Sequence, residues 1–230
     1  MGVPALVTVA HGTRTPAGNL VAAELTAAAA ARLGWTATTS YVELSEPLFA
    51  DVVAGTGQPT VVVPLLLSTG FHLRQDLPEA VAAAPRAELV RLGRSLGPDP
   101  LLAAAQADRL REAGATPGQP VVLVAAGSTD PTATADLEGA VAFLAEAWGA
   151  PVRLATLSGL GERPEHVVRS GDAVSPYLLS TGYFHRKLRH DALAAGASLV
   201  GDVIGPHQLV VDLVCERAVA LAAEGADLTE

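Results

Sequence analysis

Two histidines and one glutamate follow three apolar, strand-like segments of the chain. His11 comes directly after the first segment, Glu43 lies at the end of the second, and His72 lies in the loop that leaves the third. The segments are residues 4–10, 36–44 and 60–67. If they are neighbouring parallel strands, about 4.8 Å apart, their ends lie within roughly 10 Å of one another. Two imidazoles and a carboxylate at that range can share one divalent metal ion.

Each of these side chains also has a simpler interpretation when it is taken alone. A histidine after a strand can cap the next helix or bond to a loop carbonyl. Glu43 can be a solvated charge at a strand end, and His72 can be a hydrogen-bonding group of its loop. Gly12 and Gly70 can serve only to turn the chain sharply between strand and helix. The joint position of the three polar side chains at three strand ends favours a functional site.

Apolar runs alternate with helix-forming segments along the chain. Strands are expected at residues 4–10, 36–44, 60–67, 87–92, 121–126, 152–157, 173–179 and 198–204. Helices are expected at residues 16–33, 47–54, 75–84, 99–113, 132–148, 184–195 and 207–223. Half of the residues are hydrophobic but few are aromatic, so Ala, Val and Leu must form the core. The order predicts an α/β protein with parallel sheets of about four strands flanked by helices.

Three short motifs of the first half return in the second half in the same order. Residues 10–16 (AHGTRTP) match 125–131 (AAGSTDP), 96–98 (LGP) match 204–206 (IGP), and 66–72 (LLSTGFH) match 178–185 (LLSTGYFH) if one residue is inserted. An internal duplication with similar domains at residues 1–115 and 119–230 is therefore expected. We expect a monomer that acts as a pseudo-dimer of its two halves.

The second copy is an internal control on the polar residues. The counterpart of His11 is Ala126 and the counterpart of Glu43 is Ser158, so that only His185 remains from the set. A purely structural role for His11 and Glu43 does not explain why the same turn forms without them. An active first domain and a degenerate second domain explain it directly.

Composition excludes several classes of function. The net charge of −9 argues against nucleic-acid binding, because no basic stripe offsets it. No apolar run approaches the roughly 18 residues of a membrane span, and the first residues do not resemble a secretory signal. A single cysteine, Cys215, excludes an intrachain disulfide and fits a reducing compartment. We expect a cytoplasmic protein that binds neither nucleic acid nor membranes.

Taken together, the motifs resemble the sirohydrochlorin chelatases, the ATP-independent class II chelatases. The resemblance rests on residues 10–14 (AHGTR), 41–43 (YVE), 64–72 (PLLLSTGFH) and 76–78 (DLP), and it extends over the full length in the long, two-domain form. It implies a chelatase-like fold and a lyase that inserts Fe²⁺ or Co²⁺ into sirohydrochlorin on the path to sirohaem or cobalamin, with iron favoured. It also implies that His11, His72 and Glu43 bind the metal and take the pyrrole protons.

The chemistry of these residue types agrees with that implication. Metal insertion expels two pyrrole protons, and an imidazole, whose pKa in water is about 6.5, can accept one near neutral pH. Three protein ligands leave positions on the metal open for the macrocycle nitrogens. The metal enters as a substrate, and no organic cofactor is expected. ATP is not expected either, because the chain contains no G-x-x-x-x-G-K-[ST] motif.

The substrate that the resemblance implies is a polyanionic tetrapyrrole, whereas the protein is acidic, so local positive groups and loop residues must bind it. The substrate-binding candidates are Arg14, Ser68, Thr69, Gly70 and Arg74 in the first half, and His185, Arg186 and Lys187 in the second. Any one of these cations can equally belong to a solvated helix face.

Three other functions were weighed against insertion. A histidine phosphotransfer enzyme usually presents Arg-His-Gly after its first strand, and Ala10 stands at the arginine position. A carrier of metal or tetrapyrrole would use the same His and Glu residues without catalysing insertion. A chelatase scaffold recruited to another small-molecule reaction stays open, because fold does not fix function.

Overall fold

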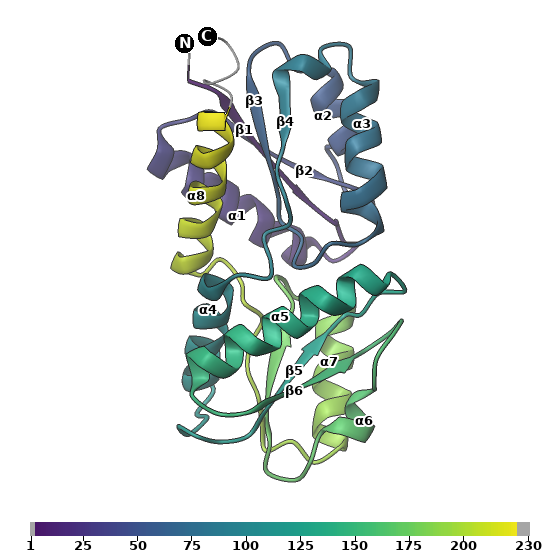
Figure 1. The fold of residues 1–230 in the computed structure, drawn as a ribbon, viewed down its shortest axis with the longest axis vertical. Helices are drawn as coiled ribbons and strands as arrows, with labels where there is room; N and C mark the ends of the chain where they lie inside the picture. Colours follow the sequence, from purple (N-terminus) through teal and green to yellow (C-terminus); the bar gives the residue numbers. More distant parts are fainter. Residues whose placement is uncertain (1–2, 225–230) are drawn as a thin grey trace. The chain divides into compact units, whose positions relative to one another are not determined.

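Strands and helices alternate along the chain, and the strands form two separate sheets (Figure 1). The structure, a computed structural model, describes residues 3–224. One sheet has the strand order β2-β1-β3-β4 and the other has the order β6-β5-β7-β8. Every strand pair in both sheets is parallel. The predicted α/β class, with two parallel sheets of four strands flanked by helices, is confirmed.

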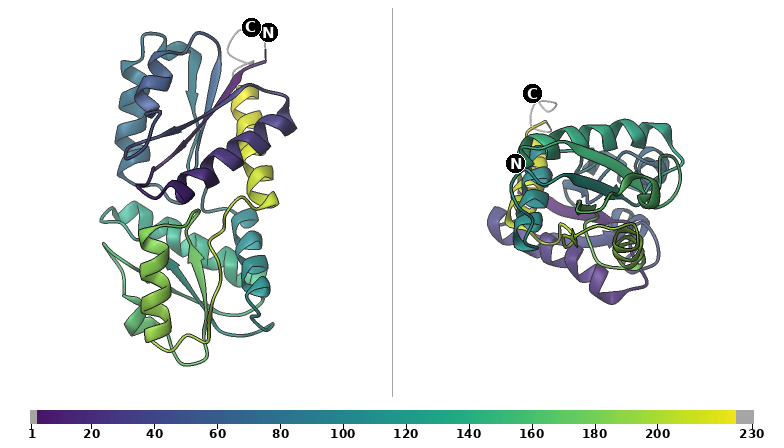
Figure 2. Two further views of the ribbon diagram at one scale, coloured as in Figure 1. Left: turned by 180° about the vertical axis from the view of Figure 1, so that it is seen from behind. Right: turned by 90° about the horizontal axis from the view of Figure 1, so that it is seen from below.

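The first unit is built on the strands β1 (Ala5–Ala10), β2 (Ala37–Tyr41), β3 (Thr60–Pro64) and β4 (Val90–Leu92). Helices α1 (Pro16–Leu33) and α8 (Gln208–Glu224) cover one face, and α2 (Phe49–Ala54) and α3 (Leu77–Ala83) cover the other (Figures 1 and 2). A π-helical turn (His72–Asp76) leads into α3, and a 3₁₀ turn (Ala87–Leu89) precedes β4. Because β1 pairs with β2 on one side and with β3 on the other, the switch point of the sheet lies at the carboxyl end of β1.

The second unit repeats this arrangement. Its strands are β5 (Val121–Ala125), β6 (Val152–Thr156), β7 (Ala173–Tyr177) and β8 (Leu199–Val200). Helices α4 (Pro100–Glu112) and α5 (Pro131–Trp148) cover one face, and α6 (Pro164–Val167) and α7 (Tyr183–Ala194) cover the other (Figures 1 and 2). As the composition requires, small aliphatic side chains fill both cores.

Backbone hydrogen bonds confirm the internal duplication. In the first unit, Leu96 N–H donates to Leu66 O at 2.8 Å; in the second, Ile204 N–H donates to Leu178 O at 2.9 Å. Helices α1 and α5 each have 18 residues, begin at a proline and end before a glycine with left-handed backbone, at φ 67° and 76° respectively. The two halves therefore share their connections as well as their sheets.

The packing units do not follow the sequence repeat. One unit contains the chain up to Leu96 and the segment from Val210 onward, and the other contains Gly97–Leu209. Helix α8 packs on α1, where the Cys215 thiol lies 3.9 Å from Ala29 O, whereas α4 packs on α5 and β7. The expected division at residues 1–115 and 119–230 stays a prediction about the repeat along the chain, because the last helix of each repeat lies in the packing unit of the other. Long connections before α4 and α8 allow this exchange, and nothing in the apolar pattern of either helix specifies its sheet.

Several elements differ from the predicted ones. The helix expected at residues 75–84 begins with the π-helical turn at His72, because Leu77 N–H donates to His72 O. Strand β4 covers only Val90–Leu92, and β8 only Leu199–Val200, since each is an edge strand paired on one side. Helix α6 has four residues and was not expected, because so short a helix carries no periodic signal.

Gly12 and Gly127 occupy equivalent places that no other residue fits. Both have left-handed backbone, with φ 92° and 89°. A Cβ on Gly12 would lie 1.8 Å from Glu43 O, and one on Gly127 would lie 2.0 Å from Ser158 O. The turn after the first strand of each repeat can therefore approach the next strand end only without a side chain.

We expect Gly12→Ala and Gly127→Ala each to lower the free energy of unfolding by about 2–4 kcal/mol, because each adds a backbone clash to a strained φ. Gly34→Ala is the matched control, since Gly34 also has a positive φ (67°) but open space around it; it should cost about 1–2 kcal/mol. Urea unfolding followed by circular dichroism measures all three. Equal losses in the three variants would show that the close approach is not the cause.

Candidate metal centre

The structure brings His11, Glu43 and His72 together. The Nε2 atoms of the two histidines lie 3.2 Å apart, and His11 Nε2 lies 3.6 Å from Glu43 Oε1. One ligand atom from each of the three residues lies within 4.8 Å of the others. The side chains are 50%, 52% and 30% exposed for His11, Glu43 and His72, so the group is open to solvent. The predicted convergence at three adjacent strand ends is what the sheet order produces.

Hydrogen bonds between the strand ends place His11 beside Glu43. Past the last paired residues of β1 and β2, Val42 N–H donates to Ala10 O and Glu43 N–H donates to His11 O at 3.1 Å. The backbone of Gly12 then passes against Glu43, as described above. The turn after β1 therefore holds the imidazole and the carboxylate on neighbouring chain segments.

His72 reaches the same point from the π-helical turn that follows the loop after β3. Its ring stands nearly perpendicular to that of His11, with an interplanar angle of 87° and ring centroids 4.7 Å apart. Its Nδ1 lies 2.5 Å from Asp76 Oδ2. Asp76 was not among the predicted site residues. The signal was its spacing of four residues from His72, which places two side chains on one helical face.

The contacts of the two rings determine which nitrogens can bind a metal. His11 Nδ1 faces the Gly12 carbonyl at 3.2 Å, and His72 Nδ1 faces the Asp76 carboxylate. Carbonyl and carboxylate oxygens accept hydrogen bonds, so a ring hydrogen on Nδ1 of each histidine would satisfy both contacts. In that tautomer each Nε2 presents a lone pair to the other, and a cation between the two nitrogens would satisfy both.

The spacing also suits a first-row metal. An ion about 2.1 Å from two imidazole nitrogens holds them roughly 3.0–3.4 Å apart at coordination angles of about 90–109°. The observed 3.2 Å lies in that range. Imidazole and carboxylate ligands together suit iron, cobalt, nickel and zinc.

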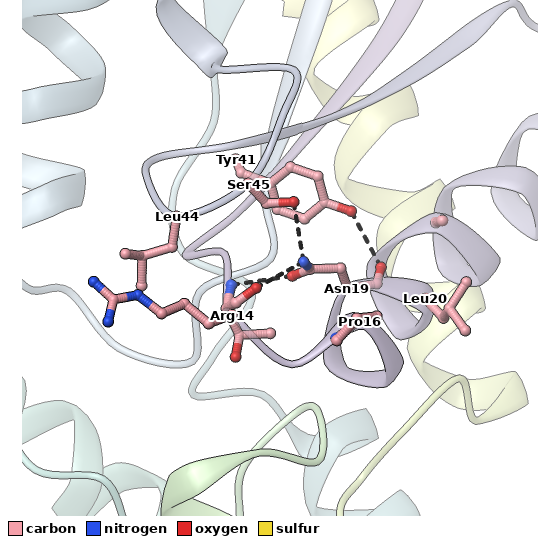
Figure 3. A pocket seen from close by; sticks show the side chains of 9 residues that line it. Arg14, Pro16, Asn19, Leu20, Tyr41, Leu44 and Ser45 are labelled. Atoms are coloured by element: carbon pink, nitrogen blue, oxygen red, sulfur yellow. Dashed lines mark hydrogen bonds between the residues drawn. The ribbon is translucent and has the colours of Figure 1, made fainter.

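A hollow lies between the turn after β1, the start of α1 and the segment that follows β2 (Figure 3). Its lining residues are Thr13, Arg14, Pro16, Asn19, Leu20, Ala23, Tyr41, Leu44 and Ser45. The Asn19 amide donates to Thr13 O and to Ser45 Oγ, and the Tyr41 hydroxyl donates to Asn19 O. These bonds hold the walls in place, whereas the exposed Arg14 side chain extends at the rim.

In the second unit, the corresponding loop after β6 is hydrogen-bonded to the turn after β5. Gly159, the counterpart of Leu44, would clash with Ser128 O if it carried a Cβ, and Leu160 N–H donates to Ser128 O. The Arg163 guanidinium fastens this loop by donating to Gly159 O at 2.7 Å and to Gly161 O at 3.0 Å. In the first unit Leu44 has the same φ of 63° but an exposed side chain. The two repeats therefore hold this loop in different ways.

The other predicted binding residues lie on two segments. Ser68, Thr69 and Gly70 are half-buried in the loop after β3, and Arg74 is exposed in the π-helical turn. On α7, Arg186 is exposed, whereas Lys187 donates to Asp191 at 2.6 Å, and this hydrogen bond raises the pKa of the lysine. Their roles in substrate binding stay predictions.

His185 was predicted to be the counterpart of His72 in the second unit, and this prediction is wrong by one residue. Arg74 N–H donates to Gly70 O, and Arg186 N–H donates to Gly182 O, so the two loops match without an insertion. Phe184 therefore stands at the His72 position. Together with Ala126 and Ser158, whose hydroxyl donates to Ala126 O at 2.7 Å, it leaves the second unit with none of the three ligands at the equivalent positions.

His185 takes the place of Leu73 and packs against its own unit. Its side chain is 12% exposed, and its Nε2 lies 3.9 Å from Asp202 Oδ1, beyond hydrogen-bonding distance. Burial lowers the pKa of His185, an effect that the Asp202 carboxylate opposes and the neighbouring arginines reinforce. Its surroundings therefore favour the neutral form of the imidazole.

Comparison with known proteins matches this chain to one family over nearly its whole length. The CbiX family model matches residues 5–113 and 120–221. The chain belongs to the CbiX family. The resemblance to sirohydrochlorin chelatases predicted from the His-Gly and Gly-x-His loops is thereby confirmed, and the two matched segments follow the sequence repeat.

Individual proteins that are similar to this CbiX-family chain are named as sirohydrochlorin chelatases. It is 29% identical over 206 residues to the sirohydrochlorin ferrochelatase of Bacillus subtilis strain 168, covering 81% of this chain and 78% of the relative. It is similar to SirB from Bacillus subtilis with Fe³⁺, with 26% identity, a TM-score of 0.84 and 97% of each chain covered. SirB from the subspecies spizizenii in complex with cobalt gives 25% identity, a TM-score of 0.81 and the same coverage.

Across residues 3–224, none of the helices combines the length and the hydropathy that crossing a membrane requires.

Substitution of His185 by Leu tests its packing role. The lowered pKa means that the unfolded chain binds more protons at this residue than the folded chain, so the folded state loses stability as the pH falls below about 6.5. We expect His185→Leu to raise the Tm, and to raise it more at pH 5 than at pH 8. The same substitution at exposed His190 is the control. An equal pH dependence in the two variants, followed by circular dichroism, would contradict this reading.

Proposed function

We propose that the chain inserts a divalent metal ion into sirohydrochlorin, with Fe²⁺ as the favoured metal and Co²⁺ next. The observation that carries the proposal is the pair of histidine Nε2 atoms 3.2 Å apart, with Glu43 beside them and solvent access to all three. The relatives named as a sirohydrochlorin ferrochelatase and chelatase supply the substrate class. No ATP or organic cofactor takes part in the proposal.

The geometry suggests how the residues act. His11 Nε2, His72 Nε2 and a Glu43 oxygen hold the incoming metal and leave its remaining positions open to the macrocycle nitrogens. When the metal passes to the macrocycle, the two imidazole lone pairs and the carboxylate are released and can accept the two pyrrole protons. The same three groups thus first hold the cation and then take the protons that it displaces.

Positive features near the trio fit a polyanionic substrate. Arg14 lies at the rim of the hollow, and Arg74 lies two residues from His72. The first turn of α1 contains no acidic residue and its N-cap, Thr15, makes no side-chain capping bond. In α5 the equivalent residue, Asp130, caps the helix itself by accepting from Thr132 N–H. Uncapped N–H groups at a helix start bind anions such as carboxylates.

The choice between iron and cobalt does not follow from the ligand types. Affinity at imidazole and carboxylate sites rises from Fe²⁺ through Co²⁺ to Ni²⁺ whatever the physiological metal. Iron is favoured because many organisms that need sirohaem make no cobalamin. We also propose that the chain works in the cytoplasm as a monomer.

The reaction is tested by single-turnover absorbance of metal-free sirohydrochlorin mixed with the protein and either Fe²⁺ or Co²⁺. We expect insertion to be faster than in buffer, and the faster metal to be iron. A chain that binds metal or macrocycle but does not accelerate insertion would be a carrier, and the proposed activity would be rejected.

We expect His11→Ala and His72→Ala each to slow insertion at least about 100-fold, because each removes a metal ligand and a proton acceptor. The folded state should persist, since both side chains are at the surface. His190→Ala, which removes an exposed imidazole from α7, is the matched control and should insert metal at the wild-type rate. Full activity of either ligand variant would remove that residue from the mechanism.

A further inference from the structure

Asp76 makes a short hydrogen bond that the chelation chemistry itself does not require. Its Oδ2 lies 2.5 Å from His72 Nδ1, and both side chains are about one-third exposed. The backbone of Asp76 is helical, with φ −62° and ψ −45°, because the π-helical turn runs directly into α3. Its side chain makes no capping bond to that helix. The carboxylate is directed at the imidazole instead of at its own helix.

The π-helical turn produces this pairing, and the second unit lacks it. Gly70 and Gly182 are equivalent by their backbone hydrogen bonds, and the next fully buried leucines are Leu77 and Leu188. Seven residues separate the first pair and six the second, so the first repeat has one residue more within the π-helical turn. Single π-helical turns often mark functional sites. The repeat that has the metal ligands is also the one that has the extra residue and the carboxylate.

We propose that Asp76 is a positioning residue that fixes His72 as the Nδ1–H tautomer and aims its Nε2 at the metal position. Free imidazole side chains in water favour the Nε2–H tautomer, which would direct a hydrogen, and not a lone pair, at His11. A carboxylate on Nδ1 reverses that preference and leaves the lone pair on Nε2. The inference rests on the proposed function for its consequence in catalysis, but the tautomer and metal binding can be measured without the macrocycle.

The test compares Asp76→Ala and Asp76→Asn with Glu79→Ala, which removes the same charge from the first turn of α3. Titration of each full-length protein with Co²⁺ alone, followed by calorimetry, gives the Kd. We expect Asp76→Ala to weaken Co²⁺ binding about 10- to 100-fold. Asp76→Asn should lie between it and the wild type, because the amide oxygen can still accept from Nδ1–H. Glu79→Ala should keep the wild-type Kd.

The ¹⁵N spectrum of the histidine side chains gives a readout that a merely structural role would not move. In the metal-free wild type the His72 ring should show a protonated Nδ1 and an unprotonated Nε2, and in Asp76→Ala it should shift toward the Nε2–H form. An Asp76→Ala protein that is folded by circular dichroism and keeps both the wild-type tautomer and the wild-type Kd for Co²⁺ would overturn the inference. Equally weak binding by the Ala and Asn variants would also overturn it.

Failure of this inference and failure of the proposed function give different results. If the wild type binds Co²⁺ but does not accelerate insertion into sirohydrochlorin, chelation is rejected while the Asp76 comparison still decides the positioning role. If insertion is accelerated and Asp76→Ala matches Glu79→Ala in Kd and in rate, chelation stands and the positioning role is rejected.

Discussion

The approach of two imidazole Nε2 atoms to 3.2 Å is the constraint that organises the first unit. Two ring nitrogens this close repel unless a hydrogen or a cation lies between them, so the surrounding structure must hold the rings in place. On the His11 side the holding element is the turn at Gly12, whose lack of a side chain lets it pass against Glu43. On the His72 side it is the π-helical turn with Asp76. Both lie at the carboxyl ends of adjacent parallel strands, where the topology gathers loops from separate parts of the chain.

The duplication distinguishes residues that the fold requires in both repeats from residues that are present only in the first. Gly12 and Gly127 have the same backbone conformation and the same close approach, so that turn is structural. The residues beside it differ: His11 and Glu43 in one unit, Ala126 and Ser158 in the other. The second unit uses its loop for closure, with Arg163 bonded to the carbonyls of Gly159 and Gly161. The same fold thus presents solvent-exposed polar side chains at the strand ends of one repeat and a hydrogen-bonded loop in the other.

The exchange of α4 and α8 links the two repeats covalently and by packing. Each sheet needs a helix on the face where α1 or α5 lies, and the helix that fills the place comes from the end of the other repeat. Each unit therefore contains residues from both matched segments of the family model. Neither repeat, cut at the sequence boundary near residue 117, would carry a full set of helices for its own sheet.

The sequence by itself determined the fold class, the duplication and the three side chains that converge at the strand ends. Alternating apolar runs predict parallel sheets through burial on both faces, and strand-end positions predict convergence, because parallel strands bring their carboxyl ends to one edge. Only the tertiary structure decided that α8 belongs with the first sheet, that Phe184 and not His185 stands at the His72 position, and that the Asp76 carboxylate lies against His72 Nδ1. Each of these depends on a local choice of hydrogen-bond register or of packing partner. The apolar pattern of the chain is nearly the same for the alternative registers and partners. Only the contacts between segments that are distant in the sequence distinguish them.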